Sequence, residues 1–223
     1  MIDSKTHVYF VPGLAAGKEI FENISLPAEK YEIHVIEWVI PFKNESIKEY
    51  AKRMAVKVLE PNAVLIGVSF GGLMVQEMSL FLELKKLIII SSVKSKYELP
   101  KRMLFFKNIR AYKLIPSSFL DNAKDLTKYA LGVNSKKKLE LYQRYLSVNN
   151  TQYLKWAIHQ MVGWEREVEI EGVIHIHGDK DPVFPIKKIK KCIVVPNGSH
   201  IMLLTKYRWL NKNLPKIIED SFN

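Results

Sequence analysis

The sequence contains very little cysteine. Cys192 is the only cysteine among 223 residues. No disulfide can therefore form within the chain, and a zinc site built from several cysteines is excluded. A chain of this length buries about 70–75% of the surface that its unfolded state exposes, so it can form a core without cross-links.

Long apolar runs are also missing. No apolar stretch approaches the ~20 residues that span a bilayer. The first apolar run is interrupted by Pro12 and Gly13 and has no basic segment before it, unlike a signal peptide. We therefore expect a cytoplasmic protein that does not bind membranes. Apolar residues make up 48% and charged residues 26% of the chain, which is typical of a globular domain and excludes a disordered or fibrous protein.

The chain carries a formal net charge of +11, from 34 basic and 23 acidic residues. Most of this excess lies in residues 94–140, which hold 12 lysines and arginines and 4 acidic residues. Such a segment can be simply a solvated basic face. It can also dock an acidic carrier protein or a phosphate-bearing acyl group such as a coenzyme A thioester. No nucleic-acid-binding motif accompanies it, so we expect no nucleic-acid partner.

Short runs rich in aliphatic and β-branched residues alternate with longer stretches of helical periodicity. This alternation predicts an α/β fold with a mainly parallel, doubly wound sheet of six strands and helices on both faces. The expected strands are residues 7–11, 31–38, 63–68, 86–91, 173–177 and 191–195, and the expected helices between them are residues 47–58, 72–84 and 206–221.

One connection is far longer than the others. About 80 residues separate the fourth strand from the fifth, whereas a parallel crossover needs only a dozen or more. This segment has helical patterns at residues 101–113, 118–131, 135–146 and 152–160 and no convincing strand. We therefore expect residues 1–92 and 171–223 to form the core, and residues 93–170 to form a helical cap inserted at one end of the sheet.

The motif G-x-S-x-G occurs at Gly67 to Gly71, with Ser69 at its centre. It follows a strand expected to be buried on both faces and precedes a helix. A serine on such a sharp turn projects its hydroxyl above the sheet edge, and the glycines let the backbone bend. The alternative is a glycine-rich turn in which the serine only caps the helix.

A serine hydroxyl needs a base to become a nucleophile. His200 is the candidate, because it follows the last expected strand, at the sheet edge where α/β proteins place ligands. The base in turn needs a carboxylate that holds its tautomer. Two carboxylates, Asp179 and Asp181, follow the preceding strand.

With these residues in place, the sequence resembles the α/β-hydrolase superfamily, whose triad runs serine, acid, histidine along the chain. Many members carry a histidine-glycine pair, two residues, the acid, and a proline four residues later. Here this pattern starts at His177-Gly178 and makes Asp181 the acid. Asp179 remains an alternative, as does an acid after an earlier strand, such as Glu98.

The resemblance also implies an oxyanion hole made of two backbone N–H groups. One would come from Phe70, after the nucleophile, and the other from Leu14, after the first strand, with Ala15 as the alternative donor. Many relatives have His-Gly where this chain has Pro12-Gly13. Because only a backbone N–H is needed, the departure does not argue against activity.

The implied function is a serine hydrolase that cleaves a small-molecule carboxylic ester or thioester through Ser69, His200 and Asp181. No cofactor or metal is required: His175 and His177 share a strand face, but no third ligand accompanies them. A lyase using the same triad and a non-catalytic binding protein are the alternatives. Serine at the nucleophile position argues against the dehalogenase and epoxide-hydrolase branches, which use aspartate there.

Overall fold

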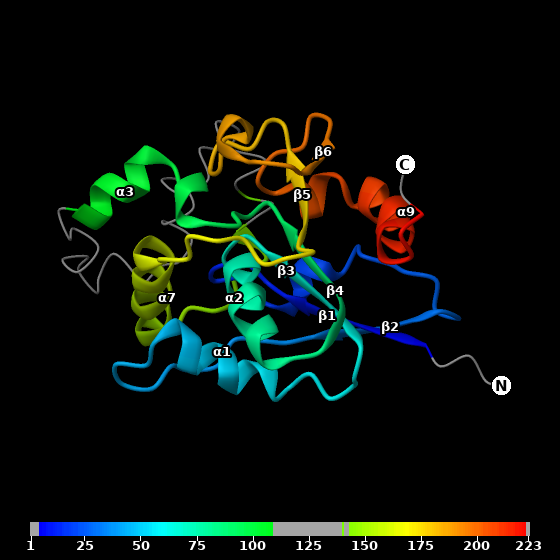
Figure 1. Cartoon of the computed structure of the whole chain (residues 1–223), viewed down its shortest axis with the longest axis horizontal. Coiled ribbons are helices and arrows are strands. Elements are labelled where there is room, and N and C mark those ends of the chain that lie inside the picture. The colour runs from blue at the N-terminus through cyan, green and yellow to red at the C-terminus, as the bar shows by residue number, and fades with distance from the viewer. Residues whose placement is uncertain (1–4, 109–139, 141–142, 222–223) are drawn as a thin grey trace.

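Six strands form one sheet in the computed structural model, which describes residues 5–108, 140 and 143–221. All neighbouring strands are parallel, in the order β2-β1-β3-β4-β5-β6 (Figure 1). Their bounds are β1 Thr6–Val11, β2 Tyr31–Val35, β3 Ala63–Val68, β4 Leu84–Ile90, β5 Ile174–Gly178 and β6 Ile193–Val195. The six-stranded, doubly wound parallel sheet expected from the sequence is confirmed.

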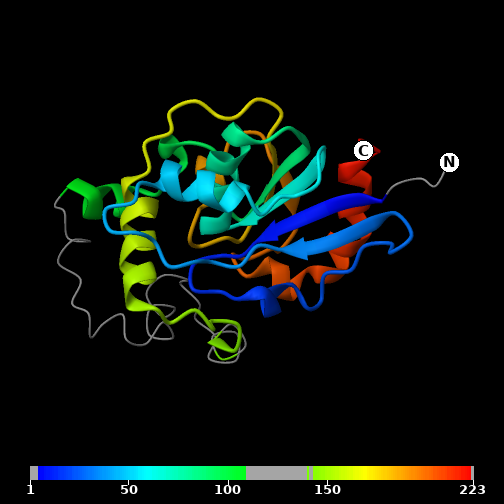
Figure 2. The same ribbon diagram turned by 90° about the horizontal axis from the view of Figure 1, so that it is seen from below.

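Helices cover both faces of this sheet. Figure 2 shows α1 (Ile47–Ala55) and α2 (Phe70–Met78) on one face, and α8 (Met202–Thr205) and α9 (Tyr207–Ile218) on the other. A short 3₁₀ helix, η1 (Lys18–Phe21), contacts α8. β3 lies in the middle and is buried at all six positions, as its uninterrupted apolar sequence predicts.

Most elements begin or end within a few residues of the predicted bounds, and two of the differences bear on the site. β2 ends at Val35 instead of residue 38, although the Ile36 N–H still donates to the Phe10 carbonyl. The helix expected at residues 72–84 begins at Phe70, ends at Met78 and gives way to a 3₁₀ turn, η2 (Ser79–Phe81). The chain then enters β4 at Leu84.

The insertion between β4 and β5 contributes α3 (Lys101–Asn108) and α7 (Thr151–Gly163). Both helices lie beyond the end of the sheet to which the arrows of β1 and β2 point (Figure 2). The expected helix at residues 118–131 and most of that at residues 135–146 lie outside the described residues. The first and last segments of the insertion lie side by side, because the Lys96 N–H donates to the Arg166 carbonyl at 2.7 Å.

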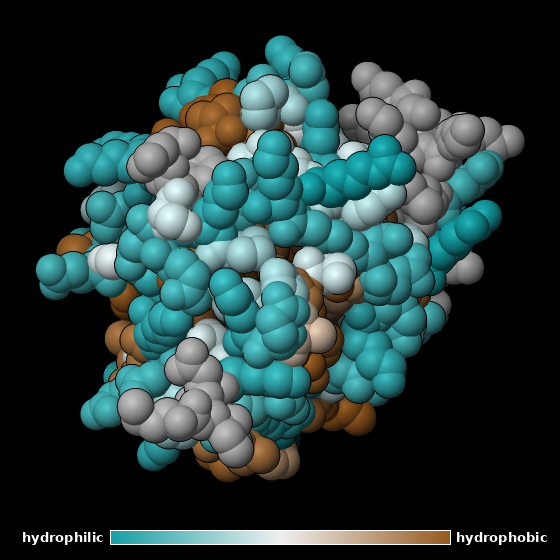
Figure 3. Space-filling model, turned by 90° about the vertical axis from the view of Figure 1, so that its right-hand side faces the viewer, coloured by the Kyte–Doolittle hydropathy of each residue, from teal (hydrophilic) through white to brown (hydrophobic). Residues whose placement is uncertain are grey.

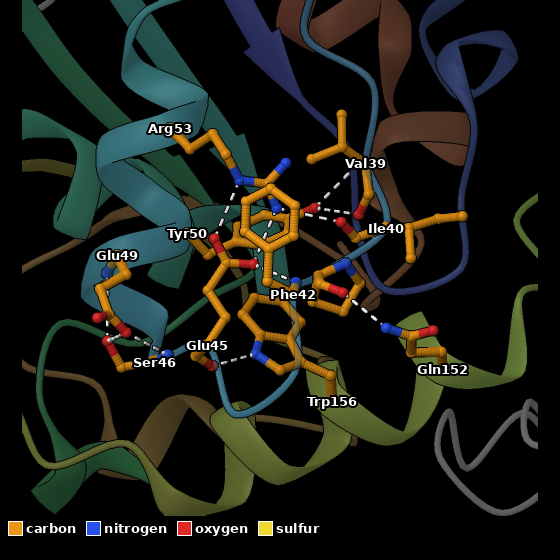
Figure 4. A network of polar contacts seen from close by, with 11 residues as sticks. Val39, Ile40, Phe42, Glu45, Ser46, Glu49, Tyr50, Arg53, Gln152 and Trp156 are labelled. Carbon is orange, nitrogen blue, oxygen red and sulfur yellow. Dashed lines mark hydrogen bonds and ion pairs between the residues drawn. The ribbon is translucent and has the colours of Figure 1, made fainter.

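Helix α7 is fastened to the loop between β2 and α1 (Figure 4). Trp156 Nε1 donates to the Glu45 carbonyl, and Gln152 Nε2 donates to the Pro41 carbonyl, both at 2.7 Å. The nearly buried Glu45 carboxylate is itself held by Arg53, whose Nε and Nη2 lie 3.0 and 2.8 Å from its two oxygens. This network places the helix at the carboxyl ends of the strands.

No helix within residues 5–108 and 143–221 is both long enough and apolar enough to cross a membrane.

Candidate active site

Ser69 occupies the turn between β3 and α2 in an unusual backbone conformation. Its φ and ψ are 53° and −117°, a sparsely populated region that costs about 1–3 kcal/mol for a non-glycine residue. The surrounding structure holds this conformation. The Ser69 N–H donates to the Ile90 carbonyl at 2.9 Å, and its own carbonyl accepts from Ser92 Oγ at 2.8 Å.

Three glycines around Ser69 leave no room for a side chain, two of them against backbone and one against Ser92. A Cβ on Gly67 would lie 2.2 Å from the Gly71 carbonyl oxygen, and one on Gly71 would lie 2.3 Å from the Pro12 carbonyl oxygen. A Cβ on Gly72 would lie 2.3 Å from Ser92 Oγ. The glycines of the motif therefore let the start of α2 approach the loop that follows β1.

Gly71→Ala is expected to lower the free energy of unfolding by about 3 kcal/mol, because the new methyl group meets backbone that cannot rotate away. Urea denaturation measures this difference. Gly163→Ala is the matched control: no atom lies within 4 Å of a Cβ there, and alanine favours the helix. Equal stabilities for the two variants would contradict this account of the turn.

His200 lies in the loop after β6 and reaches Ser69. The distance from Ser69 Oγ to His200 Nε2 is 2.9 Å, and that from His200 Nδ1 to Asp181 Oδ2 is also 2.9 Å. The loops after β5 and β6 approach closely, since a Cβ on Gly178 would lie 2.2 Å from the Gly198 carbonyl oxygen. The structure thus brings together the serine, histidine and aspartate that the sequence singles out.

Asp181 is only 4% exposed and is held in one orientation. Its Oδ1 accepts from the N–H groups of Val183 and Phe184, at 2.7 and 3.0 Å. Burial alone would raise the pKa of Asp181, but the facing His200 imidazole, its hydrogen bond and the Phe184 N–H together lower it. The carboxylate therefore stays ionised beside His200 Nδ1.

Two buried histidines lie behind Asp181. His177 Nε2 is 2.8 Å from the Phe184 carbonyl oxygen, which can only accept, so this nitrogen carries the proton. His177 Nδ1 is then an acceptor and receives the Nε2 proton of His175 at 3.1 Å. Burial lowers the pKa of both histidines. The His177 N–H also points near Asp181 Oδ2, at 3.6 Å, which favours the ionised carboxylate.

The two alternative acids lie elsewhere. Glu98 is buried and accepts from the backbone N–H groups of Lys94 and Lys190, at 2.7 and 2.8 Å. Asp179 makes no hydrogen bond to His200 within the described structure, although its own N–H faces the Val195 carbonyl. Glu98 therefore joins the segment after β4 to the segment before β6. Asp181 is the carboxylate that contacts the histidine.

Leu14 and Phe70 carry the two N–H groups expected at an oxyanion hole. Among the described residues, neither the Leu14 N–H nor the Phe70 N–H donates to a carbonyl or side-chain oxygen. Ala15 has a left-handed φ of 62°, and its carbonyl accepts from the Val148 N–H at 3.0 Å. The loop after β1 is thus tied to the insertion, while the Leu14 N–H donates to none of the described residues.

Trp38 holds the same loop from the other side, a role that no sequence pattern indicates. Its Nε1 donates to the Gly13 carbonyl at 3.0 Å, and its ring packs against Phe70 with centroids 5.3 Å apart. The ring of Tyr153, on α7, also packs against Trp38, with centroids 5.4 Å apart. One side chain thereby links both candidate oxyanion segments and the insertion.

Trp38→Phe keeps an aromatic ring but removes the hydrogen bond to Gly13. For the ester hydrolysis that the sequence resemblance implies, we expect kcat to fall about tenfold with little change in KM. The loosened loop would stabilise the transition state less than in the wild type, while substrate binding would change little. Steady-state kinetics measures this. Trp209→Phe, on α9, serves as the control for loss of an indole elsewhere. A change confined to KM would contradict the assigned role.

Solved structures with similar folds are numerous, although no protein-family model and no curated protein sequence matches the chain. Bromoperoxidase from Bacillus anthracis has a TM-score of 0.72 at 16% identity, over 97% of this chain and 92% of that one. An esterase from Exiguobacterium antarcticum has a TM-score of 0.67 at 18% identity, over 98% and 93%. An epoxide hydrolase of the α/β-hydrolase superfamily, from hot-environment metagenomes, has a TM-score of 0.70 at 9% identity, over 97% and 91%.

The proteins named in these structures have different activities. At sequence identities this low, the similarity is evidence for the fold and not for a particular activity. The sheet of six parallel strands with helices on both faces agrees with it. The chain therefore has the α/β-hydrolase fold.

Proposed function

We propose that the protein is a serine hydrolase that cleaves carboxylic esters through an acyl-enzyme. The observation that carries the proposal is the unbroken line of hydrogen bonds from Ser69 through His200 to Asp181. The strained conformation of Ser69 adds to it, because strain of this kind persists where function requires it. Ser69 stands at the N-cap position of α2, but its side chain makes no capping hydrogen bond to that helix.

The mechanism follows from the protons that these groups can hold. Ser69 Oγ attacks the ester carbonyl while His200 Nε2 takes its proton, and Asp181 stabilises the imidazolium that forms. The N–H groups of Leu14 and Phe70 would bind the negative oxygen of the tetrahedral intermediate. His200 then protonates the leaving alcohol, and a water molecule activated by His200 releases the acid.

A thioester on an acidic carrier is the more specific variant of this proposal, and it depends on the basic insertion. Three of the described basic residues in this segment already interact with other groups of the same chain. Lys94 and Lys96 form ion pairs with Glu169 and with two further glutamates, and Arg102 donates to the Pro182 and Val183 carbonyls. A carrier would have to contact other basic residues of the segment, so simple esters are the first substrates to try.

Labelling with a fluorophosphonate probe tests the proposal. Wild-type protein is expected to be labelled, and Ser69→Ala and His200→Ala proteins are expected to stay unlabelled. Hydrolysis of p-nitrophenyl esters of increasing acyl length, followed by acyl thioesters, would then define the substrate. A folded wild-type protein that neither reacts with the probe nor turns over any ester would overturn the proposal in favour of a binding protein. Labelling without a hydrolysis product would instead favour the lyase.

A further inference from the structure

A cluster of metal-ligating side chains lies on the sheet edge, away from the candidate active site. His7 on β1 and Glu32 and His34 on β2 place their nitrogen and oxygen atoms within 4.8 Å of one another. His7 stands opposite Glu32 in the strand register, and Tyr9 stands opposite His34. Because side chains two residues apart share a face of a strand, all of them point to the same side of the sheet. The backbone ladder between the strands fixes their spacing.

We propose that His7, Glu32 and His34 bind a divalent transition metal ion, and that this ion is zinc. Two imidazoles and one carboxylate form a donor set that zinc accepts in tetrahedral sites, where a fourth position is left for water. This proposal is independent of the hydrolase mechanism, which uses none of the three residues.

The distances between the donor atoms fit this proposal. His7 Nδ1 lies 2.9 Å from His34 Nε2, and His34 Nε2 lies 3.9 Å from Glu32 Oε1. Ligand atoms around a tetrahedral zinc ion are ~3.3 Å apart, given bonds of about 2.0–2.1 Å. One pair would have to separate and the other to approach by about half an ångström, which small side-chain rotations supply. The zinc ion would replace the proton that the two facing nitrogens now share.

The histidine rings are already oriented by their neighbours. His34 stacks on the buried ring of Tyr9 with centroids 4.5 Å apart, and on His7 with centroids 5.2 Å apart. Tyr9 is held in turn, because its hydroxyl accepts from the Leu59 N–H at 3.2 Å. Preorganised ligands lose little freedom on binding, and such supporting contacts strengthen metal sites.

The surroundings admit a hydrated cation. The cluster lines a surface pocket of about 380 Å³, which also contains Glu37, Glu60 and Lys57. Together with Glu32, the pocket has three carboxylates and one ammonium group, and this excess of negative charge attracts cations. β2 is an edge strand on the side of the molecule that Figure 3 shows, and this face is mostly hydrophilic. A fourth, exchangeable water ligand therefore has room.

Calorimetric titration of tag-free protein with zinc chloride tests the site. One zinc ion per chain is expected to bind, with a rise in thermal midpoint at saturating zinc. His34→Phe keeps the ring stacked on Tyr9 but removes the nitrogen ligand, and Glu32→Gln keeps the shape but removes the charge. Each is expected to weaken binding about tenfold or more. The same variants with cobalt should lose the absorption typical of a four-coordinate ion.

Two control variants separate this site from general surface binding. Glu37→Gln removes a carboxylate from the same pocket but not from the cluster, and His159→Ala removes an exposed histidine on α7. Both are expected to bind zinc as the wild type does. Absence of stoichiometric binding to the wild type would overturn the proposal. Binding that survives both His34→Phe and Glu32→Gln would also overturn it, because the ion would lie elsewhere.

Discussion

A Ser69→Gly protein is expected to lose kcat/KM by a factor of about 10⁵ or more and yet to be more stable than the wild type. The activity falls because no other group can replace the nucleophile in a triad that acts as a unit. The stability rises by about 1 kcal/mol, because glycine adopts a φ of 53° without steric cost and the relief exceeds its larger unfolded-state entropy.

Ester hydrolysis and urea denaturation of the same preparations measure the two effects. Ser69→Ala is the matched variant: it should be equally inactive but gain no stability, since its Cβ keeps the strain. If Ser69→Gly were less stable than Ser69→Ala, the backbone of Ser69 would not be strained in the way described. If it retained activity, another residue would be the nucleophile.

Asp181→Asn is expected to lower kcat by about 10⁴-fold without displacing the loop. The amide oxygen can still accept from the Val183 and Phe184 N–H groups, so the NH₂ group must face His200 Nδ1. That nitrogen would then have to be an acceptor, and the ring proton would move to Nε2. A histidine with its proton aimed at Ser69 cannot act as the base.

Asp179→Asn is the control for this substitution and should retain nearly all of the activity, because Asp179 does not contact His200 in the described structure. Proton NMR of the His200 ring would report the tautomer directly. Equal losses in the two variants would remove the distinction between the two acids. An active Asp181→Asn protein would mean that the carboxylate does not orient the base.

The lowered pKa of Asp181 also makes its contribution to stability dependent on pH. A group whose pKa is lower in the folded than in the unfolded state stabilises the fold above the unfolded-state pKa, and this contribution disappears as pH falls through the folded-state value. The stability difference between wild type and Asp181→Asn should therefore narrow in acid, where the protonated carboxyl and the amide resemble each other.

The grouping of Ser69, His200 and Asp181 could be predicted because each of them follows a strand of recognisable sequence. Parallel strands end at one edge, so Ser69 after β3, Asp181 after β5 and His200 after β6 had to meet there. The ends of the helices were harder to predict. The apolar residues Leu80 and Phe81 continue the helical pattern of α2, yet they are 49% and 37% exposed and belong to the turn into β4.

Contacts between different elements could not be predicted from the sequence. The alternating pattern of β2 continues to Trp38 in the sequence, but β2 ends at Val35 and Trp38 donates to the Gly13 carbonyl. The grouping of His7 with Glu32 and His34 depends on the register of β1 against β2. A single sequence carries no signal for a register between segments about 25 residues apart, because several alignments bury the same apolar face.

The order of these elements along the chain determines when each residue of the site emerges during synthesis. β1 to β4 are contiguous in sequence and already surround the turn that carries Ser69. His200 lies 131 residues further on, on a loop after β6, which among the described strands pairs with β5 alone. A ribosome-bound chain can therefore display its serine well before the histidine emerges. Ser69 would therefore have no histidine beside it until the last strands had joined the sheet.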